Sequence, residues 1–552
     1  MRSWLIALAL VAAACVPTVE EVPGGAVDSR VLPVSETSPG RAGQETVAPA
    51  DTDLVCPEDA GSGERARTWS DVTEAWGMVD PLLGMFVHAA AWGDVDGDGR
   101  PDLVVGTFAD RDPGRYRERG AEGPSPDRLL LGGPEGFTAV DLPAEPGRTS
   151  GAVFVDLDGD GDDDLALSRN AGLKNQMPGG LLLFENVAGE LVLRVVLTLP
   201  GFQARTVGTF DVDRDGRLDL VVAEDRYGET GTRIFANGGD WTFTDITERA
   251  GIGVVFGLGL TTLDLSGDGI ADLFVAGDNR LFLGVGDGTF RMVDSSVFEW
   301  ARFGPEDLVG GVAAGDVDGD GLPDLVVGHH FNSTVEEGRR VPVRLYLNRG
   351  GGRFDDVTER AGLVGLPTKA PHVEVADLDN DGVPDILTSA GAGDRLAVFW
   401  GRGVEAGIPR FDPPEGLGTP RYWVAAPTVD LDGDGVLDVF LAEFEPSAPS
   451  RMLLGGGGGN WLEVSVEGPG RGVGTVVEVR DRQDVVLGVA ELTPTAGYSS
   501  GRQAVAHVGL GTVETVDVVL RLPEGGEVRL DGVEANRRVR WDTALREFLI
   551  TC

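Results

Sequence analysis

The sequence predicts an all-β protein: a seven-bladed β-propeller followed by a small C-terminal β-sandwich-like domain. Three observations carry this prediction. An aspartate-rich loop motif recurs seven times, a β-rich run such as DLVVG or DILTS directly follows each copy, and the first aspartates of successive copies lie 62, 55, 53, 52, 61 and 53 residues apart. A period in the low fifties is the length of one four-stranded propeller blade with its loops.

The repeated motif is Asp-x-Asp-x-Asp-Gly-x-x-Asp, and its residues are numbered here from position 1, the first aspartate, to position 9, the last. In the fourth copy a serine replaces the aspartate at position 3. The predicted metal ligands, copy by copy, are Asp94, Asp96, Asp98 and Asp102; Asp156, Asp158, Asp160 and Asp164; Asp211, Asp213, Asp215 and Asp219; Asp264, Ser266, Asp268 and Asp272; Asp316, Asp318, Asp320 and Asp324; Asp377, Asp379, Asp381 and Asp385; Asp430, Asp432, Asp434 and Asp438.

The residue types in this motif suit calcium. Ca²⁺ takes six to eight oxygen ligands, and carboxylates at positions 1, 3 and 5 converge when a glycine at position 6 allows a sharp turn. A backbone carbonyl at position 7 and the aspartate at position 9 would complete the shell. No histidine or cysteine lies in any loop, which disfavours zinc and copper. We therefore expect up to seven Ca²⁺ ions, with weaker binding in the fourth loop because the Ser266 hydroxyl is neutral.

The loops are not EF-hands. An EF-hand carries a bidentate glutamate at position 12 and a helix after it. Here strand-like runs follow, and the residues at position 12 are Val105, Leu167, Val222, Val275, Val327, Thr388 and Leu441.

The chain is strongly acidic, with a formal net charge of −44 over 552 residues. This charge argues against nucleic acid and anionic lipid headgroups as partners. Apolar runs recur along the chain, so it does not resemble a disordered acidic protein. The spacing of the aspartates favours metal sites over a merely salt-adapted surface.

Residues 1–15 are predicted to be an export signal, with a basic Arg2, a short apolar stretch and Cys15. The ending Ala12-Ala13-Ala14-Cys15 resembles the bacterial lipobox, although alanine stands where leucine is usual; the resemblance implies that Cys15 is lipidated. The alternative is ordinary signal cleavage. Residues 16–66 have the composition of a flexible tether. Cys56 and Cys552 are expected either to pair in an oxidising compartment or to remain thiols.

The propeller is expected over residues 67–457 and the second domain over 458–552. The segment TWSDVTEAWGM at 68–78 matches FTDITERAGI at 243–252 and FDDVTERAGL at 354–363, yet it precedes the first loop. We therefore expect it to supply the outer strand of the last blade, which closes the ring.

Two known families share these patterns. The loop, its strand and the Gly-x-Gly-x-Phe turn that follows resemble the FG-GAP (VCBS, integrin α-type) repeat over about 68–456. FDDVTERAGL is similar to the cartilage acidic protein family. GYSS at 497–500 and HVGLG at 507–511 resemble the ASPIC/UnbV domain, although Leu522 stands where a tryptophan often does. The resemblance implies calcium binding and an extracellular or surface location, without a settled reaction.

Other candidate sites are weaker. Ser499 lies in a Gly-x-Ser-x-Gly sequence, but a strand and not a helix is expected after it, so a β-turn is favoured over a nucleophile elbow. His88, His329, His330 and His372 could act as acid or base, but packing roles are favoured. Tryptophans that could line a carbohydrate groove are expected mainly in the core.

The sequence therefore predicts a surface-anchored, calcium-binding propeller that is not an enzyme and acts in binding, adhesion or scaffolding. Its expected partners are an unknown protein or glycan at the cell surface and, through the lipid, a membrane. The expected location is the outer membrane or cell surface, with the periplasm or the medium as alternatives. The alternative function is an extracellular hydrolase or lyase that acts on polysaccharide or phosphoester.

Overall fold

The computed structural model describes residues 28–31 (backbone only), 67–171, 177–294, 296–299, 308–330, 340–392, 395–444 and 449–551. Strands dominate these residues. Their helices are α1 (Pro113–Glu118), α2 (Thr247–Ala250) and two 3-10 turns, η1 (Ser296–Phe298) and η2 (Pro469–Gly472). The all-β class is thus confirmed. None of the helices in this described part has the length and hydropathy needed to cross a membrane.

Seven antiparallel sheets, here called blades 1 to 7, follow one another in the described residues, and each contains one aspartate loop. Blade 1 is β3 (Val87–Gly93), β4 (Asp102–Thr107), β5 (Arg128–Gly133) and β6 (Gly136–Asp141). Blade 2 is β7 (Thr149–Val155), β8 (Asp164–Arg169), β9 (Gly179–Val187) and β10 (Glu190–Leu199), with β1 (Asp28–Val31) beside β10. Blade 3 is β11 (Ala204–Phe210), β12 (Asp219–Glu224), β13 (Arg233–Asn237) and β14 (Phe243–Asp245).

Blade 4 is β15 (Gly257–Leu263), β16 (Asp272–Gly277), β17 (Arg280–Gly284) and β18 (Phe290–Val293). Blade 5 is β19 (Val309–Gly315), β20 (Asp324–His329), β21 (Arg344–Asn348) and β22 (Phe354–Asp356). Blade 6 is β23 (Val373–Ala376), β24 (Asp385–Ala392) and β25 (Arg395–Phe399), with β28 (Arg421–Tyr422) beside β24; the hairpin β26 (Gly401–Glu405) and β27 (Ile408–Phe411) follows β25. Blade 7 is β29 (Thr428–Val429), β30 (Asp438–Leu441), β31 (Arg451–Gly456) and β2 (Thr68–Asp71).

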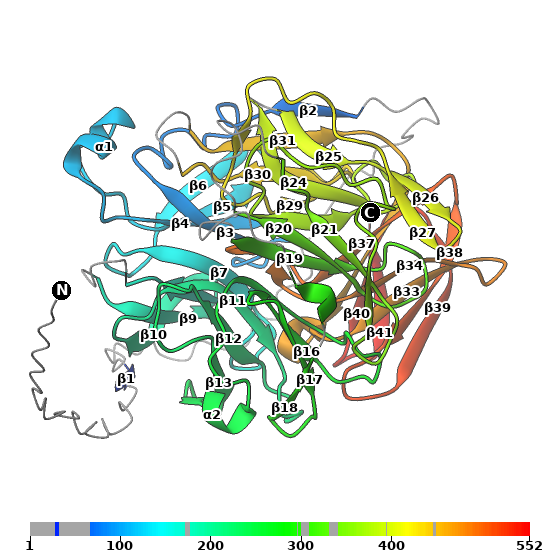
Figure 1. The fold of residues 1–552 in the computed structure, drawn as a ribbon, viewed down its shortest axis with the longest axis horizontal. Coiled ribbons are helices and arrows are strands. Elements are labelled where there is room, and N and C mark those ends of the chain that lie inside the picture. Colours follow the sequence, from blue (N-terminus) through cyan, green and yellow to red (C-terminus); the bar gives the residue numbers. More distant parts are fainter. Residues whose placement is uncertain are drawn as a thin grey trace, which may run out of the picture.

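The blades form a closed ring. Seven hydrophobic clusters each join two neighbouring blades, and one of them joins blade 7 to blade 1 through residues that include Trp92 and Phe440. The N-terminal segment closes the last blade as expected, since β2 pairs with β31 from Thr68 opposite Gly456. In Figure 1 the colours accordingly run around the body from blue through green to yellow. This is a propeller arrangement, in which the faces of each sheet pack against the neighbouring blades.

The C-terminal domain is a sandwich of two four-stranded sheets, drawn mainly in red in Figure 1. One sheet is β37 (Val505–Gly511), β32 (Asn460–Glu467), β40 (Arg537–Asp542) and β41 (Glu547–Thr551). The other is β34 (Val486–Glu491), β33 (Val476–Asp481), β38 (Thr515–Arg521) and β39 (Glu527–Glu534). Alternating apolar residues of both sheets, such as Val477 and Val539, form one shared core.

A hairpin of this domain enters the centre of the ring. It consists of β35 (Thr495–Ala496) and β36 (Ser500–Gly501), and β36 pairs in parallel with β3 of blade 1. The Gly497 carbonyl accepts a hydrogen bond from Val312 of blade 5 at 3.3 Å. The Ser499 N–H donates to Thr206 Oγ1 of blade 3 at 3.0 Å. Contacts with blades on different sides of the ring place this hairpin on the propeller axis, and it is called the axial hairpin below.

Candidate metal centres

Each aspartate loop is folded by its own first carboxylate. In all seven loops the aspartate at position 1 accepts a hydrogen bond from the N–H of the glycine at position 6, at 2.7–3.1 Å. These glycines have φ between 79° and 97°, which side chains with a Cβ rarely adopt. The aspartate at position 5 accepts the N–H of position 7 at 2.8–3.1 Å. The motif therefore specifies one tight turn, seven times.

This turn brings the carboxylates together. Sets of three carboxylate oxygens that lie within 4.8 Å of one another include those of Asp94, Asp96 and Asp102; Asp156, Asp158 and Asp164; Asp211, Asp213 and Asp215; Asp316, Asp318 and Asp320; and Asp377, Asp379 and Asp385. Oxygen atoms at this separation can share one hard cation. That these residues, and those of the other two loops, are calcium ligands stays a prediction.

Several of these oxygens are buried in the described structure without a hydrogen-bond donor. They are Oδ1 of Asp94, Asp213 and Asp318 and Oδ2 of Asp272. A buried carboxylate oxygen without a partner is costly. A bound cation would be a suitable partner for such an oxygen, so these oxygen ligands fit Ca²⁺.

The aspartate at position 9 has a second role that the sequence interpretation missed. Its Oδ1 accepts a backbone N–H near the end of the third strand in six blades, and from Gly401, the first residue of β26, in blade 6, at 2.7–2.8 Å. In six loops its Oδ2 accepts the N–H of position 2, at 2.7–3.0 Å. This carboxylate therefore ties the loop to its sheet. The fourth loop, which contains Ser266, is the exception.

Burial raises the pKa values of the position 9 carboxyl groups, and the charges of neighbouring aspartates raise them further. The backbone N–H bonds that these carboxylates accept lower the pKa values and offset part of the rise. The pKa is raised to about 7 for Asp102, Asp219 and Asp272. It is raised to about 8 for Asp324 and Asp385 and to about 9 for Asp164. Without a cation, the folded loop therefore disfavours full ionisation at neutral pH.

Arginine side chains contact several loops, and the loop motif alone does not predict these contacts. Arg349 lies 3.0 Å from Asp318 in the fifth loop, and Arg67 lies 2.7 Å from Asp379 in the sixth. These guanidinium groups offset part of the local negative charge.

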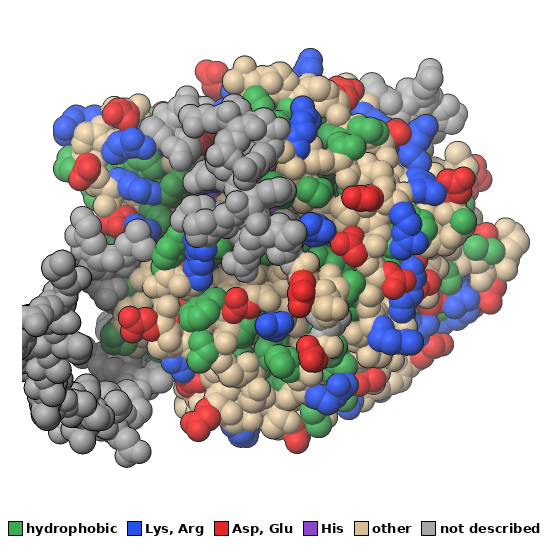
Figure 2. Space-filling model, in the orientation of Figure 1, with side chains coloured by type: hydrophobic (Ala, Val, Ile, Leu, Met, Phe, Trp, Pro, Cys, Tyr) green, Lys and Arg blue, Asp and Glu red, His purple; other side chains and the backbone are tan. Residues whose placement is uncertain are grey.

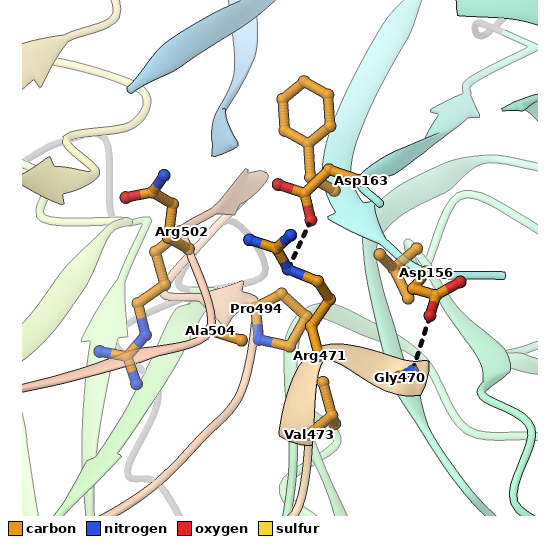
Figure 3. A pocket seen from close by; sticks show the side chains of 11 residues that line it. Asp156, Asp163, Gly470, Arg471, Val473, Pro494, Arg502 and Ala504 are labelled. Atoms are coloured by element: carbon orange, nitrogen blue, oxygen red, sulfur yellow. Dashed lines mark hydrogen bonds and ion pairs between the residues drawn. The ribbon is translucent and has the colours of Figure 1, made fainter. Parts of the chain in front are cut away.

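The C-terminal domain lies on the loop face of the propeller. Figure 3 shows Arg471 directed at Asp163 and the Gly470 N–H directed at Asp156, with distances of 3.5 Å and 2.7 Å. The cavity beside them measures about 10 Å³, the space of one water molecule. Glu491 accepts the Asp264 N–H at 2.9 Å in the fourth loop.

The same domain also reaches the sixth and seventh loops. His507 Nε2 lies 2.8 Å from Asn380 Oδ1, and Arg538 donates to Asp430 Oδ2 at 2.7 Å. Elsewhere the two bodies enclose a cavity of about 1400 Å³, lined by Asp211, Asp316 and Leu487 among others. The chain's own second domain therefore occupies part of the loop face.

Of the other sequence candidates, Ser499 and three of the histidines are buried, and His330 is half-buried. Ser499 lies at the turn of the axial hairpin with φ 58° and no exposed surface, and no helix follows it. His372 Nε2 lies 3.3 Å from Glu374 Oε1, and His372 Nδ1 lies 3.4 Å from Ser500 Oγ. All three side chains are wholly buried or nearly so, which leaves no room for a substrate.

His88 is not part of that group, since its ring stacks on Phe108 at 4.3 Å between centroids. Trp92 and Trp423 are core residues. Cys15, Cys56 and Cys552 lie outside the described residues.

Comparison with known proteins identifies the repeats and the second domain. The model for the FG-GAP-like repeat matches residues 211–275, 264–327 and 334–388, and the model for the FG-GAP repeat matches 86–115. The model for ASPIC and UnbV matches residues 466–545.

Human cartilage acidic protein 1 is 27% identical over 418 residues, which cover 69% of this chain and 60% of that protein. Integrin alpha-4 of Xenopus laevis is 35% identical over 156 residues, covering 26% of this chain and 15% of that protein. A solved Agrocybe aegerita lectin that recognises non-reducing terminal N-acetylglucosamine aligns with a TM-score of 0.36 and 17% identity, over 68% of this chain and 92% of that chain. The chain thus contains FG-GAP-like repeats and an ASPIC and UnbV domain, and it is homologous to cartilage acidic protein 1 and to integrin alpha chains.

Proposed function

We propose that this protein binds calcium in its seven aspartate loops and serves as a non-catalytic binding or scaffolding protein at the cell surface. The observation that carries the proposal is the set of converging carboxylates, some with buried oxygens that no donor among the described residues satisfies. Calcium would neutralise each loop, tie the blades together and hold the surface on which the C-terminal domain sits.

A catalytic role receives less support. His372, Glu374 and Ser500 are buried, and so is His88, whose ring stacks on Phe108. A hydrolase or lyase needs an acid and a base that face one accessible cleft.

Calcium binding is tested by titrating the metal-free protein with Ca²⁺ in a calorimeter and counting the ions bound. We expect several ions per chain, with Asp213→Asn reducing the count or weakening one site. The matched control is Asp484→Asn, which changes an exposed aspartate of the C-terminal domain outside the loops. A protein that folds fully and binds no divalent ion overturns the proposal.

Surface anchoring through Cys15 and the binding role need separate tests. Metabolic labelling with a fatty acid should mark the wild-type chain and not Cys15→Ala; labelling of both, or of neither, would contradict lipidation at this residue.

A screen of glycans and surface proteins against the calcium-loaded protein tests the binding role, and enzymatic turnover of any of them would favour the alternative function, a hydrolase or lyase.

A further inference from the structure

The end of the propeller axis away from the aspartate loops is built from different residues. The first strand of each blade runs toward its loop, so the residues before that strand lie at the opposite end. Tyr498, at the turn of the axial hairpin, reaches this end and is buried against Leu258 and Val424. Tyr422 and Phe444 pack around it and stay partly exposed. The floor of this end therefore comes from the C-terminal domain and its walls from the propeller.

Cationic side chains surround these rings. Arg148 lies over the Phe108 ring at 4.0 Å, and Lys369 lies over the Tyr422 ring at 4.5 Å. Arg205 pairs with Asp225 at 2.5 Å and places its NH1 3.4 Å from His88 Nε2. The group of His88, Phe108, Arg148, Arg205, Lys369, Tyr422, Phe444 and Tyr498 is called the axial cluster.

The axial cluster has polar groups that the described chain leaves unused. Nε of Arg148 and Nδ1 of His88 are buried without a hydrogen-bond partner among the described residues. Arg148 also pairs with Asp110 at 2.5 Å, and the side chains of Arg148 and Arg205 each keep 15% exposure.

In a chain with a net charge of −44, this cluster gathers three basic side chains, Arg148, Arg205 and Lys369. Two aspartates, Asp110 and Asp225, pair with the two arginines. Burial, followed by the charges of Arg205 and Arg148, holds the pKa of His88 well below its usual range. His88 is therefore neutral at physiological pH and can exchange hydrogen bonds with hydroxyl groups. On the face drawn in Figure 2, basic and acidic side chains lie mixed.

These groups define a ligand class. A guanidinium group binds a carboxylate through paired N–H donors, and partly exposed aromatic rings offer flat apolar faces to the C–H face of a sugar. We propose that the axial cluster binds a carboxylate-bearing sugar, such as a uronic acid unit of an acidic glycan. The proposal rests on the proposed binding role and names its ligand, but it does not rest on the cation loops.

The test is calorimetric titration of the calcium-loaded full chain with a uronic acid oligosaccharide and with a neutral oligosaccharide of the same length. We expect binding of the acidic sugar that weakens with added salt, and none of the neutral one. Arg148→Gln and Lys369→Gln should each weaken binding about tenfold, since each removes one charged contact. Arg540→Gln, which changes an exposed arginine of the C-terminal domain, is the matched control and should bind as wild type.

Thermal melts in calcium establish whether each variant is folded. If Arg148→Gln unfolds, Tyr422→Ala carries the test, because Tyr422 is partly exposed whereas Lys369 is buried. Equal binding of the neutral sugar, competition by inorganic sulfate at equal strength, or no binding of the acidic sugar each overturns the proposal. Calcium stoichiometry is measured independently, so failure here is distinguishable from failure of the calcium sites.

Discussion

The two ends of the propeller axis differ in how far they repeat. At the loop end every blade finishes its first strand with the same motif, which places 27 aspartates at equivalent positions. At the other end the residues at or just before the start of those strands differ from blade to blade, and they include His88, Arg148 and Leu308. The repeated end has one task in every blade, which is to fold a turn around a cation. At the other end the residues differ between blades, so a binding site particular to this protein can form there.

Removal of calcium by a chelator should have the largest effect of the changes considered, and it should act on the loop end, because it affects all seven loops together. A ligand that binds only the folded state stabilises it by an amount that grows with its concentration over Kd, and several sites add. We expect excess chelator to lower the melting temperature by about 10 °C or more. Differential scanning calorimetry with and without chelator measures this, and unchanged melting in a calcium-free sample would contradict a structural role for the loops.

The pH dependence should reverse between the two states. The pKa values of position 9 aspartates, raised to about 7 for Asp102, about 8 for Asp324 and about 9 for Asp164, exceed those of the unfolded chain, so the metal-free fold binds more protons than the unfolded chain between about pH 4 and pH 9. Stability in chelator therefore falls as pH rises from about 6 to about 8. In excess calcium the carboxylates are held ionised, protons compete with the ion, and stability should rise or stay level over the same range. Parallel melting curves in the two conditions would show that the loops are not the cause.

The axial hairpin joins the two ends, and a single methyl group should disturb it. A Cβ on Gly497 would lie 2.5 Å from His372 Nδ1 and 2.7 Å from the Val373 carbonyl. We expect Gly497→Ala to destabilise the protein by about 2–3 kcal/mol. Denaturant unfolding measures the loss, and limited proteolysis should reveal earlier release of the C-terminal domain.

Gly525→Ala is the matched control for that experiment, because Gly525 also has positive φ but nothing lies within 4 Å of its Cβ position. An equal loss for both variants would mean that backbone strain, and not the packing of the axial hairpin, accounts for the effect.

The sequence predicted the repeated end well and the other end poorly, for physical reasons. Aspartates at fixed spacing and a glycine at position 6 determine a turn locally, so the loops, the strands after them and the outer strand at 68–71 followed from pattern alone. The position 9 aspartate was understood only in part, because its partners, such as Gly132 and Asn237, lie far along the chain. Arg148, Phe108 and Tyr498 come together only after the ring closes and the second domain inserts, and no local pattern encodes that.

The smallest effect we expect concerns the fourth loop, in which a serine replaces the aspartate at position 3. Ser266 offers a neutral hydroxyl where six loops offer a carboxylate, and Asp272 Oδ2 there lacks the N–H bond seen in the others. Ser266→Asp should add a charged ligand and tighten one calcium site by about tenfold, with little change in melting when calcium is in excess. Calcium titration of wild type and variant at limiting ion measures it. Because a fourth carboxylate without an ion adds repulsion, the same variant should melt slightly lower in chelator, and a gain in both conditions would point to packing and not to ligation.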